Sequence, residues 1–151
     1  MVTFLRSWRR GRAGAANLLP TSTGAAIAAT ETLPEFKGKF DGVAVRAPVP
    51  AGSLADIVFL RTRPTTEDEI NNIFREEAAD PRYRGVLGVA EDPIVSSDFI
   101  QDPRASIVDL SMTKVVDGNL VKVICWYDDN EWGYTNQMIR EAVRIAKECL
   151  E

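Results

Sequence analysis

The spacing of hydrophobic residues changes along the 151-residue chain, and these changes predict three helices separated by groups of strands. In the clearest helix, Thr66 and Glu69 have capping-box spacing, and Ile70, Ile73 and Phe74 follow with the period of a helix that buries one face. A run of alanines behind a cluster of hydroxyl residues predicts another helix. The predicted helices cover residues 25–33, 66–79 and 134 onward.

Shorter segments alternate between apolar and polar residues with a period of two, or are continuously apolar, which is typical of strands. Asp117-Gly118 separates two of them and is a strong signal for a tight hairpin. The order of elements predicts an α+β fold, a mostly antiparallel sheet with helices packed on it. The predicted strands cover residues 42–49, 54–60, 85–89, 106–111, 113–116 and 120–127.

The composition is that of an ordinary globular domain, with 45% hydrophobic and 26% charged residues. No apolar run approaches the roughly 20 residues that a membrane-spanning helix needs. These figures exclude a disordered chain and a disulfide scaffold. They also predict a protein with no membrane partner.

Histidine is absent, which removes the commonest catalytic base and the commonest metal ligand from this sequence. The two cysteines, Cys125 and Cys149, are far apart and have no metal-site spacing. Cys125 alternates with valines, and we expect both cysteines to be small buried hydrophobic residues. Two unpaired cysteines are consistent with a reducing compartment and predict a cytoplasmic protein.

The first 30 residues contain four arginines and no acidic residue, although the whole chain has a net charge of −4. Such a segment is consistent with a transit peptide, a nucleic-acid-binding arm or an anion-binding segment, and a solvated helix face is the plainest alternative. The folded structure predicted after Pro20 weighs against a transit peptide. A pI near 5.0 without a second basic patch predicts no nucleic-acid partner.

Two features have the chemistry of an anion site. The helix predicted to begin near Gly24 presents unpaired backbone N–H groups beside the hydroxyl of Thr23. Arg46 lies in an alternating strand, where a guanidinium either pairs with a carboxylate or holds an anion. Taken alone, the first feature is better explained by a plain helix cap, and an ion pair explains Arg46 at least as well as an anion does. Together they predict that phosphate binds between Gly24 and Arg46.

A loop dense in aromatic and amide side chains, residues 126–134, joins the last predicted strand to the last helix. Such loops often bind a ligand, and a helix cap with an aromatic anchor is the alternative. The sequence has no Gly-x-Gly-x-x-Gly motif after a strand and no Walker-type loop. The chain itself therefore carries no recognisable nucleotide-binding fold.

Taken together, several of these segments resemble the glyceraldehyde-3-phosphate dehydrogenase family in order and spacing. The resemblance covers only the later part of the family's second, catalytic domain. It implies an unmatched segment over 1–8, one partial catalytic domain over 9–151, and no dinucleotide-binding domain. The segments that carry it are Arg9-Arg10-Gly11-Arg12-Ala13, Asn17–Ala26, Leu33–Lys39, Gly42–Pro50, Val95-Ser96-Ser97-Asp98 and Trp126–Tyr134.

The resemblance implies roles for four residues that bind phosphate. The family's arginine matching Arg10 lies near the substrate phosphate. The residues matching Thr23 and Gly24 hold the attacking inorganic phosphate, and the arginine matching Arg46 contacts substrate or inorganic phosphate. The implied ligand is inorganic phosphate or a phosphorylated small molecule.

On the cofactor side, the asparagine matching Asn130 holds the nicotinamide amide in the family, and the tyrosine matching Tyr134 lies near the reactive thiol. The resemblance implies NAD or NADP as the family's cofactor, with none expected to bind this chain alone. The family's nucleophilic cysteine and histidine base have no counterpart here, because neither Cys125 nor Cys149 matches the nucleophile.

The implied function is that of a phosphorylating dehydrogenase, which oxidises an aldehyde to an acyl phosphate, with this chain inactive alone. A non-catalytic anion-binding or oligomer-assembly module is the alternative, and an organellar protein with a transit peptide is a third. The expected protein partners are further copies of the chain or a complementing cofactor domain. One departure concerns the cofactor side, since Asp128-Asp129-Asn130 has one residue more than the family's usual Trp-Tyr-Asp-Asn-Glu.

Overall fold

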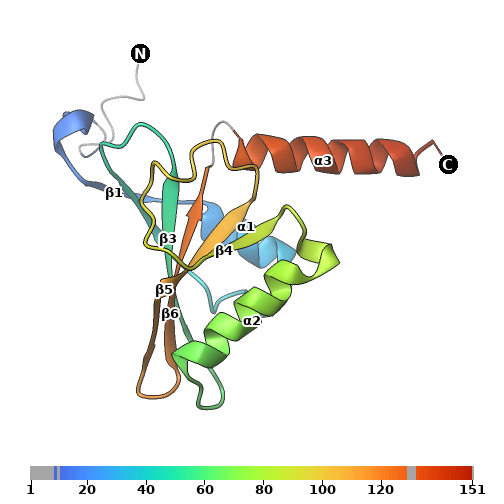
Figure 1. Cartoon of the computed structure of the whole chain (residues 1–151). Helices are drawn as coiled ribbons and strands as arrows, with labels where there is room; N and C mark the ends of the chain where they lie inside the picture. Colours follow the sequence, from blue (N-terminus) through green and yellow to red (C-terminus); the bar gives the residue numbers. More distant parts are fainter. Residues whose placement is uncertain (1–8, 10, 129–131, 151) are drawn as a thin grey trace. The chain divides into compact units, whose positions relative to one another are not determined.

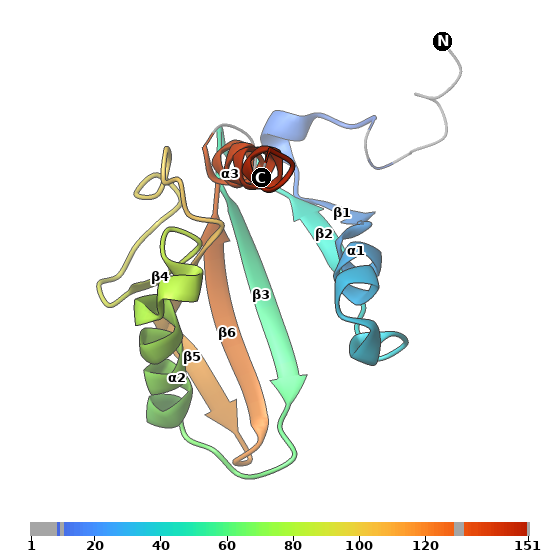
Figure 2. The ribbon, with the colours of Figure 1, turned by 90° about the vertical axis from the view of Figure 1, so that its right-hand side faces the viewer.

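The computed structural model describes residue 9, residues 11–128 and residues 132–150. The chain divides into two compact units, residues 1–50 and residues 51–151. Figures 1 and 2 show the elements of both units from two directions. Among the described residues, no helix is long and apolar enough to cross a membrane.

The first unit contains a two-stranded antiparallel ribbon and one α-helix. The ribbon pairs β1 (Leu19–Ser22) with β2 (Val43–Arg46), and α1 (Ala25–Thr32) follows β1 after two residues. Short 3-10 turns, η2 (Gly14–Ala16) and η3 (Pro34–Phe36), flank these elements. Because Pro34 begins η3 directly after Leu33, the helix ends where the sequence predicts.

The second unit contains a four-stranded sheet with the strand order β3-β6-β5-β4. Neighbouring strands are antiparallel except for β4 and β5, which run parallel. This arrangement confirms the predicted α+β fold with a mostly antiparallel sheet. The strands are β3 (Ser53–Leu60), β4 (Leu87–Ala90), β5 (Ser106–Val116) and β6 (Leu120–Tyr127).

The predicted hairpin joins β5 to β6. Asp117 and Gly118 both have positive φ, 50° and 73°, and Asn119 N–H donates to the Val116 carbonyl at 3.3 Å. This is the backbone that favours Asp-Gly in two-residue turns. The two segments predicted on either side of Met112 form a single strand, in which the pairing register shifts between Asp109 and Lys114.

One face of the sheet is covered by α2 (Glu67–Ala79), which packs against β4 and β5 (Figure 2). Ile70 is 4% exposed and contributes to the core. Thr66 caps the helix by accepting the Glu69 N–H at 3.2 Å, as its spacing predicts. The core also contains Val108, Leu110, Val121, Val123 and Cys125.

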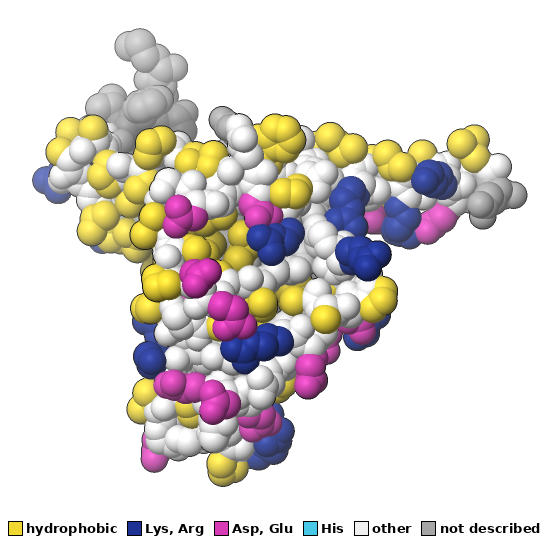
Figure 3. Space-filling model, viewed as in Figure 1, with side chains coloured by type: hydrophobic (Ala, Val, Ile, Leu, Met, Phe, Trp, Pro, Cys, Tyr) yellow, Lys and Arg dark blue, Asp and Glu magenta, His cyan; other side chains and the backbone are white. Residues whose placement is uncertain are grey.

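The last helix, α3 (Gly133–Glu148), runs away from the end of the sheet (Figure 1). Its apolar side chains gather along one edge and charged ones along the other (Figure 3). Hydrogen bonds from the first turns of α3 tie it to loops of the second unit. The exposed apolar residues of α3 are Tyr134, Met138, Ile139, Val143 and Ile145.

Two expectations from the sequence need correction. Cys149 is exposed rather than buried, because it follows the last residue of α3, at the helix end where few neighbours reach it. The second difference is β1, which begins one residue before Pro20 where no strand was predicted. Proline is tolerated there because β1 has only one partner strand.

Candidate functional site

The N-terminus of α1 begins directly after β1, and Thr23 and Gly24 form the junction. Gly24 is the N-cap residue, and its carbonyl accepts the Ala28 N–H at 3.0 Å. The Thr23 hydroxyl oxygen accepts the Ala25 N–H at 3.1 Å, from one position before the cap. The hydroxyl cluster therefore organises the helix start, as the sequence predicts, although no hydroxyl residue is the N-cap itself.

This helix start retains hydrogen-bond donors for a ligand. The first N–H groups of an α-helix have no partner within the helix, and the helix dipole places partial positive charge beside them. The first turn of α1 contains no acidic residue. Because the Thr23 oxygen accepts one of these N–H groups, its own O–H remains able to donate to an anion. A Cβ built at Gly24 would have no atom within 4 Å, so the backbone there is open to approach.

Arg46 ends β2 and pairs with Leu19 across the ribbon. Its backbone therefore lies at the other end of β1 from Ser22, the residue before Thr23, and these three residue steps are about 10 Å of strand. Leu19 lies on the same face as Arg46, since residues directly opposite each other on paired strands share a face. Arg46 is exposed and forms no ion pair with any described residue, so the ion-pair alternative has no support in this part of the chain.

Two of the predicted site residues, Arg10 and Asn130, lie outside the described residues. The neighbouring Arg9 is described, and its guanidinium donates to the Pro20 carbonyl at 3.2 Å. An arginine of the basic N-terminal segment is thereby attached to β1, the strand that leads into Thr23 and Gly24.

Tyr134 belongs to the second unit and lies in the first turn of α3. Its side chain is 64% exposed, and its backbone N–H donates to the Asp128 carbonyl at 3.2 Å. Trp132 is the N-cap residue of α3 and makes no side-chain capping bond. The aromatic anchor near this loop is instead Trp126, whose ring lies 5.2 Å from the ring of the buried Phe99.

The sequence analysis did not identify Asp128 as a buried residue, yet its side chain is 1% exposed. One carboxylate oxygen accepts the Gln101 N–H at 3.1 Å. Buried carboxylates are rare in proteins, and this one comes from a loop in which every residue except Gly133 is polar or aromatic. No pattern along the chain indicates a partner 27 positions away.

Cys125 lies in the core of the second unit, as predicted. Burial raises the pKa of its thiol, against a smaller opposing effect of a hydrogen bond with Ser106. A raised thiol pKa disfavours the thiolate, which is the nucleophilic form. Among the described residues, no group of His, Cys, Asp and Glu has the arrangement of a metal site.

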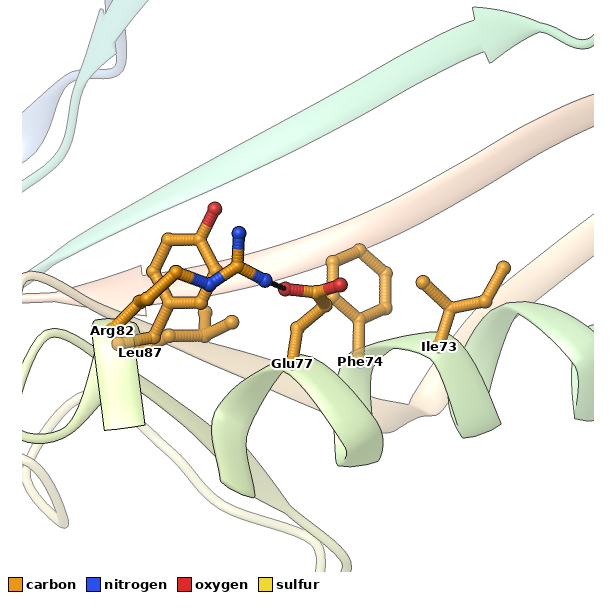
Figure 4. A pocket seen from close by; sticks show the side chains of 6 residues that line it. Ile73, Phe74, Glu77, Arg82 and Leu87 are labelled. Atoms are coloured by element: carbon orange, nitrogen blue, oxygen red, sulfur yellow. Dashed lines mark ion pairs between the residues drawn. The ribbon is translucent and has the colours of Figure 1, made fainter. Parts of the chain in front are cut away.

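A shallow groove in the second unit lies between α2 and the turn that follows it (Figure 4). Its floor is apolar, with Phe74 and Leu87, and Arg82 lies at its rim. The Arg82 guanidinium pairs with Asp80 at 3.0 Å and with Glu77 at 3.5 Å. Its charge is already neutralised within the groove, so an added anion gains little there.

Comparison with known proteins identifies relatives over most of the chain. The family model for the glyceraldehyde 3-phosphate dehydrogenase C-terminal domain matches residues 2–129. Glyceraldehyde-3-phosphate dehydrogenase of Zymomonas mobilis is 46% identical over 139 residues, and that of Haloarcula vallismortis is 50% identical over 139 residues. In both cases the match covers 92% of this chain and 41% of the relative. The chain thus spans about two fifths of the length of these curated relatives.

Proposed function

The chain belongs to the glyceraldehyde 3-phosphate dehydrogenase C-terminal domain family, and from that premise we propose that it supplies the phosphate-binding part of such an enzyme's catalytic domain. The partial domain is proposed to cover residues 9–151. The observation that carries the proposal is the open N-terminus of α1, where the Thr23 hydroxyl and unpaired N–H groups meet without an acidic neighbour.

An oxyanion at this helix start would be held by backbone N–H groups, by the Thr23 O–H and by the positive end of the helix dipole. The strand register supports a second anion position at Arg46, which lies at the far end of β1, about 10 Å of strand from Ser22. We therefore propose two positions in place of the single phosphate that the sequence predicts between Gly24 and Arg46. Inorganic phosphate is assigned to Thr23 and Gly24, and the phosphate of a phosphorylated substrate to Arg46 with Arg10. Such a separation would let phosphate attack an acyl group while the substrate is held at its other end.

The reaction proposed for the assembled enzyme is aldehyde oxidation to an acyl phosphate with NAD or NADP. The 151 residues contain no histidine to act as the base. Burial of Cys125 raises its pKa and makes it unsuitable as the nucleophile. We therefore propose that the nucleophile and the base come from a complementing cofactor domain, and that this chain alone gives no turnover.

Asn130 and Tyr134 are proposed to contact the nicotinamide side of the cofactor. Tyr134 is available for such a contact, because its ring is largely exposed and only its backbone is used within the second unit. The family's dependence on NAD supports this assignment in general terms.

We also propose that α3 binds the complementing domain. Four apolar side chains on this helix are 48% to 54% exposed, which leaves a continuous stripe without cover. A lone helix of 16 residues is marginally stable in water, so a partner would stabilise it. The alternative function, an oligomer-assembly module, would use the same stripe to bind a second copy of the chain.

The phosphate assignment can be tested on the isolated, isotope-labelled chain by titrating inorganic phosphate and following backbone amide resonances. We expect the Gly24, Ala26 and Ile27 amides to shift at millimolar phosphate, and not with chloride at equal ionic strength. Gly24→Ala should preserve the fold, because the added Cβ meets no neighbour within 4 Å. It should weaken the response about tenfold by narrowing the approach to charge-assisted hydrogen bonds.

Arg12→Ala is the matched control for removing the positive charge of Arg46, because Arg12 is another exposed arginine in the first unit. Arg46→Ala should leave the Gly24 response in place and remove a second, separate one. Absence of any shift at tens of millimolar phosphate would contradict the proposal. If Arg12→Ala changed the phosphate response as much as Arg46→Ala does, the response would reflect general attraction by positive charge and not a site at Arg46.

A further inference from the structure

The turn that contains Gln101 and the residue that follows β6, which are distant in the sequence, meet at Asp128 in the second unit. The Asp128 side chain is 1% exposed, and its Oδ2 atom accepts the Gln101 N–H at 3.1 Å. Removing a carboxylate from water is costly unless hydrogen bonds replace the water. The place of Asp128 is therefore set by the donors that surround it, and Gln101 is one of them.

The turn that supplies this donor is itself held firmly. Asp102 N–H donates to the Phe99 carbonyl at 3.0 Å, and Gln101 has a φ of 70°, in the left-handed region. That φ is unfavourable for a residue other than glycine, so the surroundings must stabilise it. Phe99 is 3% exposed and stacks near Trp126 of β6, which anchors the turn to the sheet.

A backbone hydrogen bond also joins Asp128 to the first turn of α3. The Asp128 carbonyl accepts the Tyr134 N–H at 3.2 Å, so both ends of the stretch between them are joined. Gly133 is buried, and a Cβ there would collide with the carbonyl oxygens of Asp128 and Arg104. Only glycine allows α3 to begin this close to the two carbonyls.

Side chains from the first turns of α3 bind the same group of loops. Asn136 and Gln137 donate to the Pro103 carbonyl at 3.0 and 2.8 Å. Gln137 and Arg140 donate to the Gly85 carbonyl, both at 2.7 Å. The start of α3 is thus attached by polar contacts to the 99–105 segment at Pro103 and to the loop before β4 at Gly85.

We infer that Asp128 is a positioning residue, which holds the 99–105 turn against the start of α3 and thereby sets the place of Tyr134. The functional meaning of this inference rests on the proposed role of Tyr134 beside the nicotinamide. Asp128 acts on Tyr134 indirectly, because its carboxylate accepts the Gln101 N–H and its backbone carbonyl accepts the Tyr134 N–H. Of the aspartates in this loop, Asp128 is then the one whose side chain holds the described part of the fold together.

The test uses amide hydrogen exchange in the isolated chain, compared between Asp128→Ala, Asp128→Asn and the matched control Asp129→Ala. We expect Asp128→Ala to accelerate exchange at Gln101 and Tyr134 at least tenfold, while the amides of Val121 and Val123 change less than twofold. Asp128→Asn retains an acceptor oxygen and should restore most of the protection. Asp129→Ala should match the parent chain.

Unchanged exchange at Tyr134 in Asp128→Ala would overturn the inference, and so would equal acceleration of Tyr134 and the sheet amides, which would mark a general loss of stability. If Asp128→Ala fails to fold, Asp128→Asn decides, because its weaker acceptor should raise Gln101 exchange about threefold with the sheet amides unchanged.

A second measurement adds a complementing cofactor domain and determines kcat and KM for NAD. Asp128→Ala should raise KM at least tenfold with a smaller change in kcat, and an unchanged KM would overturn the positioning role. If the two parts give no activity, the proposed function fails, while the exchange comparison still decides the role of Asp128.

Discussion

The helices α2 and α3 belong to the same unit and are both amphipathic, yet they are stabilised in different ways. The apolar face of α2 lies on the sheet, with Ile70 4% exposed, and Thr66 caps its N-terminus. The apolar face of α3 is exposed, with Ile139 at 54%, and the helix is attached by hydrogen bonds from its first turns. The difference shows that an amphipathic pattern predicts a helix but not what covers it.

The difference also concerns charge at the helix starts. The first turn of α2 contains Glu67, Asp68 and Glu69, which complement the helix dipole from within the chain. The first turn of α3 contains no acidic residue, and neither does that of α1. An external anion is therefore repelled from α2 and is not opposed by local charge at α1.

The largest expected effect follows from removing a core contact of α2. Ile70→Ala should lower the free energy of unfolding by about 2–5 kcal/mol, because it deletes buried methyl groups and leaves a cavity against the sheet. Urea unfolding followed by circular dichroism measures this change. The nearby Ile73 is 40% exposed, and Ile73→Ala is the matched control, with an expected loss well below half as large. Equal losses in the free energy of unfolding for the two substitutions would show that Ile70 is not a core contact between α2 and the sheet.

An intermediate effect is expected when apolar residues of α3 are replaced. The change should weaken binding to a partner and should leave the stability of the isolated chain nearly unchanged. Ile139→Ser with Val143→Ser should change the unfolding midpoint of the isolated chain little, since both side chains are about half exposed already. The same change should weaken binding to a complementing cofactor domain, or to a second copy, by tenfold or more. Sedimentation with and without the added domain measures both cases.

A pair of substitutions on the charged edge of α3, Glu141→Ser with Glu148→Ser, serves as the control. If the charged pair weakens association as much as the apolar pair, the exposed stripe is not the binding surface. If the parent chain sediments as a monomer and does not bind the added domain, the proposal that α3 is a binding surface is contradicted.

The smallest expected effect concerns pH and the charged N-terminus of α2. Hydrogen bonds from Arg63, Thr65 and Arg61 lower the pKa of Glu69 from 4.5 to about 2. A carboxyl whose pKa is lowered by folding stabilises the folded state above its unfolded pKa. That contribution is lost as the pH falls from about 4.5 to about 2. Because the Glu69 side chain is still 32% exposed, solvent screens these interactions and we expect a small effect.

Glu69→Gln should therefore lower the melting temperature at pH 7 and flatten its decline between about pH 4.5 and pH 2. Glu76→Gln is the control, since Glu76 lies on the same helix and forms no ion pair with any described residue. Parallel melting curves of the parent chain and Glu69→Gln across this range would contradict the assignment.

Much of the fold follows from local sequence signals. The limits of α2 and β6, the Asp-Gly hairpin and the cap at Thr66 were all predicted from residues within a few positions of each other. The β1 strand was missed because four residues that include Pro20 carry too little periodicity to indicate a strand. The parallel pairing of β4 with β5 joins segments that no short-range pattern connects.

The candidate site also has features that the sequence predicts and features that depend on the tertiary structure. Thr23 and Gly24 could be predicted because a helix start and its hydroxyl neighbours are adjacent in the sequence. The distance between them and Arg46 depends on the register of β1 against β2, which the sequence pattern does not set in so short a ribbon. The burial of Asp128 depends on a turn 27 residues away, and side-chain type alone predicts an exposed carboxylate.

The sequence by itself determined the α+β class, the helix and strand periods and the family, because hydrophobic spacing, turn residues and ordered motifs act over short distances along the chain. The tertiary structure decided which amphipathic face is covered, where Arg46 lies along the β1–β2 ribbon, and that the Asp128 side chain is enclosed. The physical reason is that burial and hydrogen-bond partners are properties of neighbours in space. Chain segments far apart in the sequence become such neighbours only when the sheet forms.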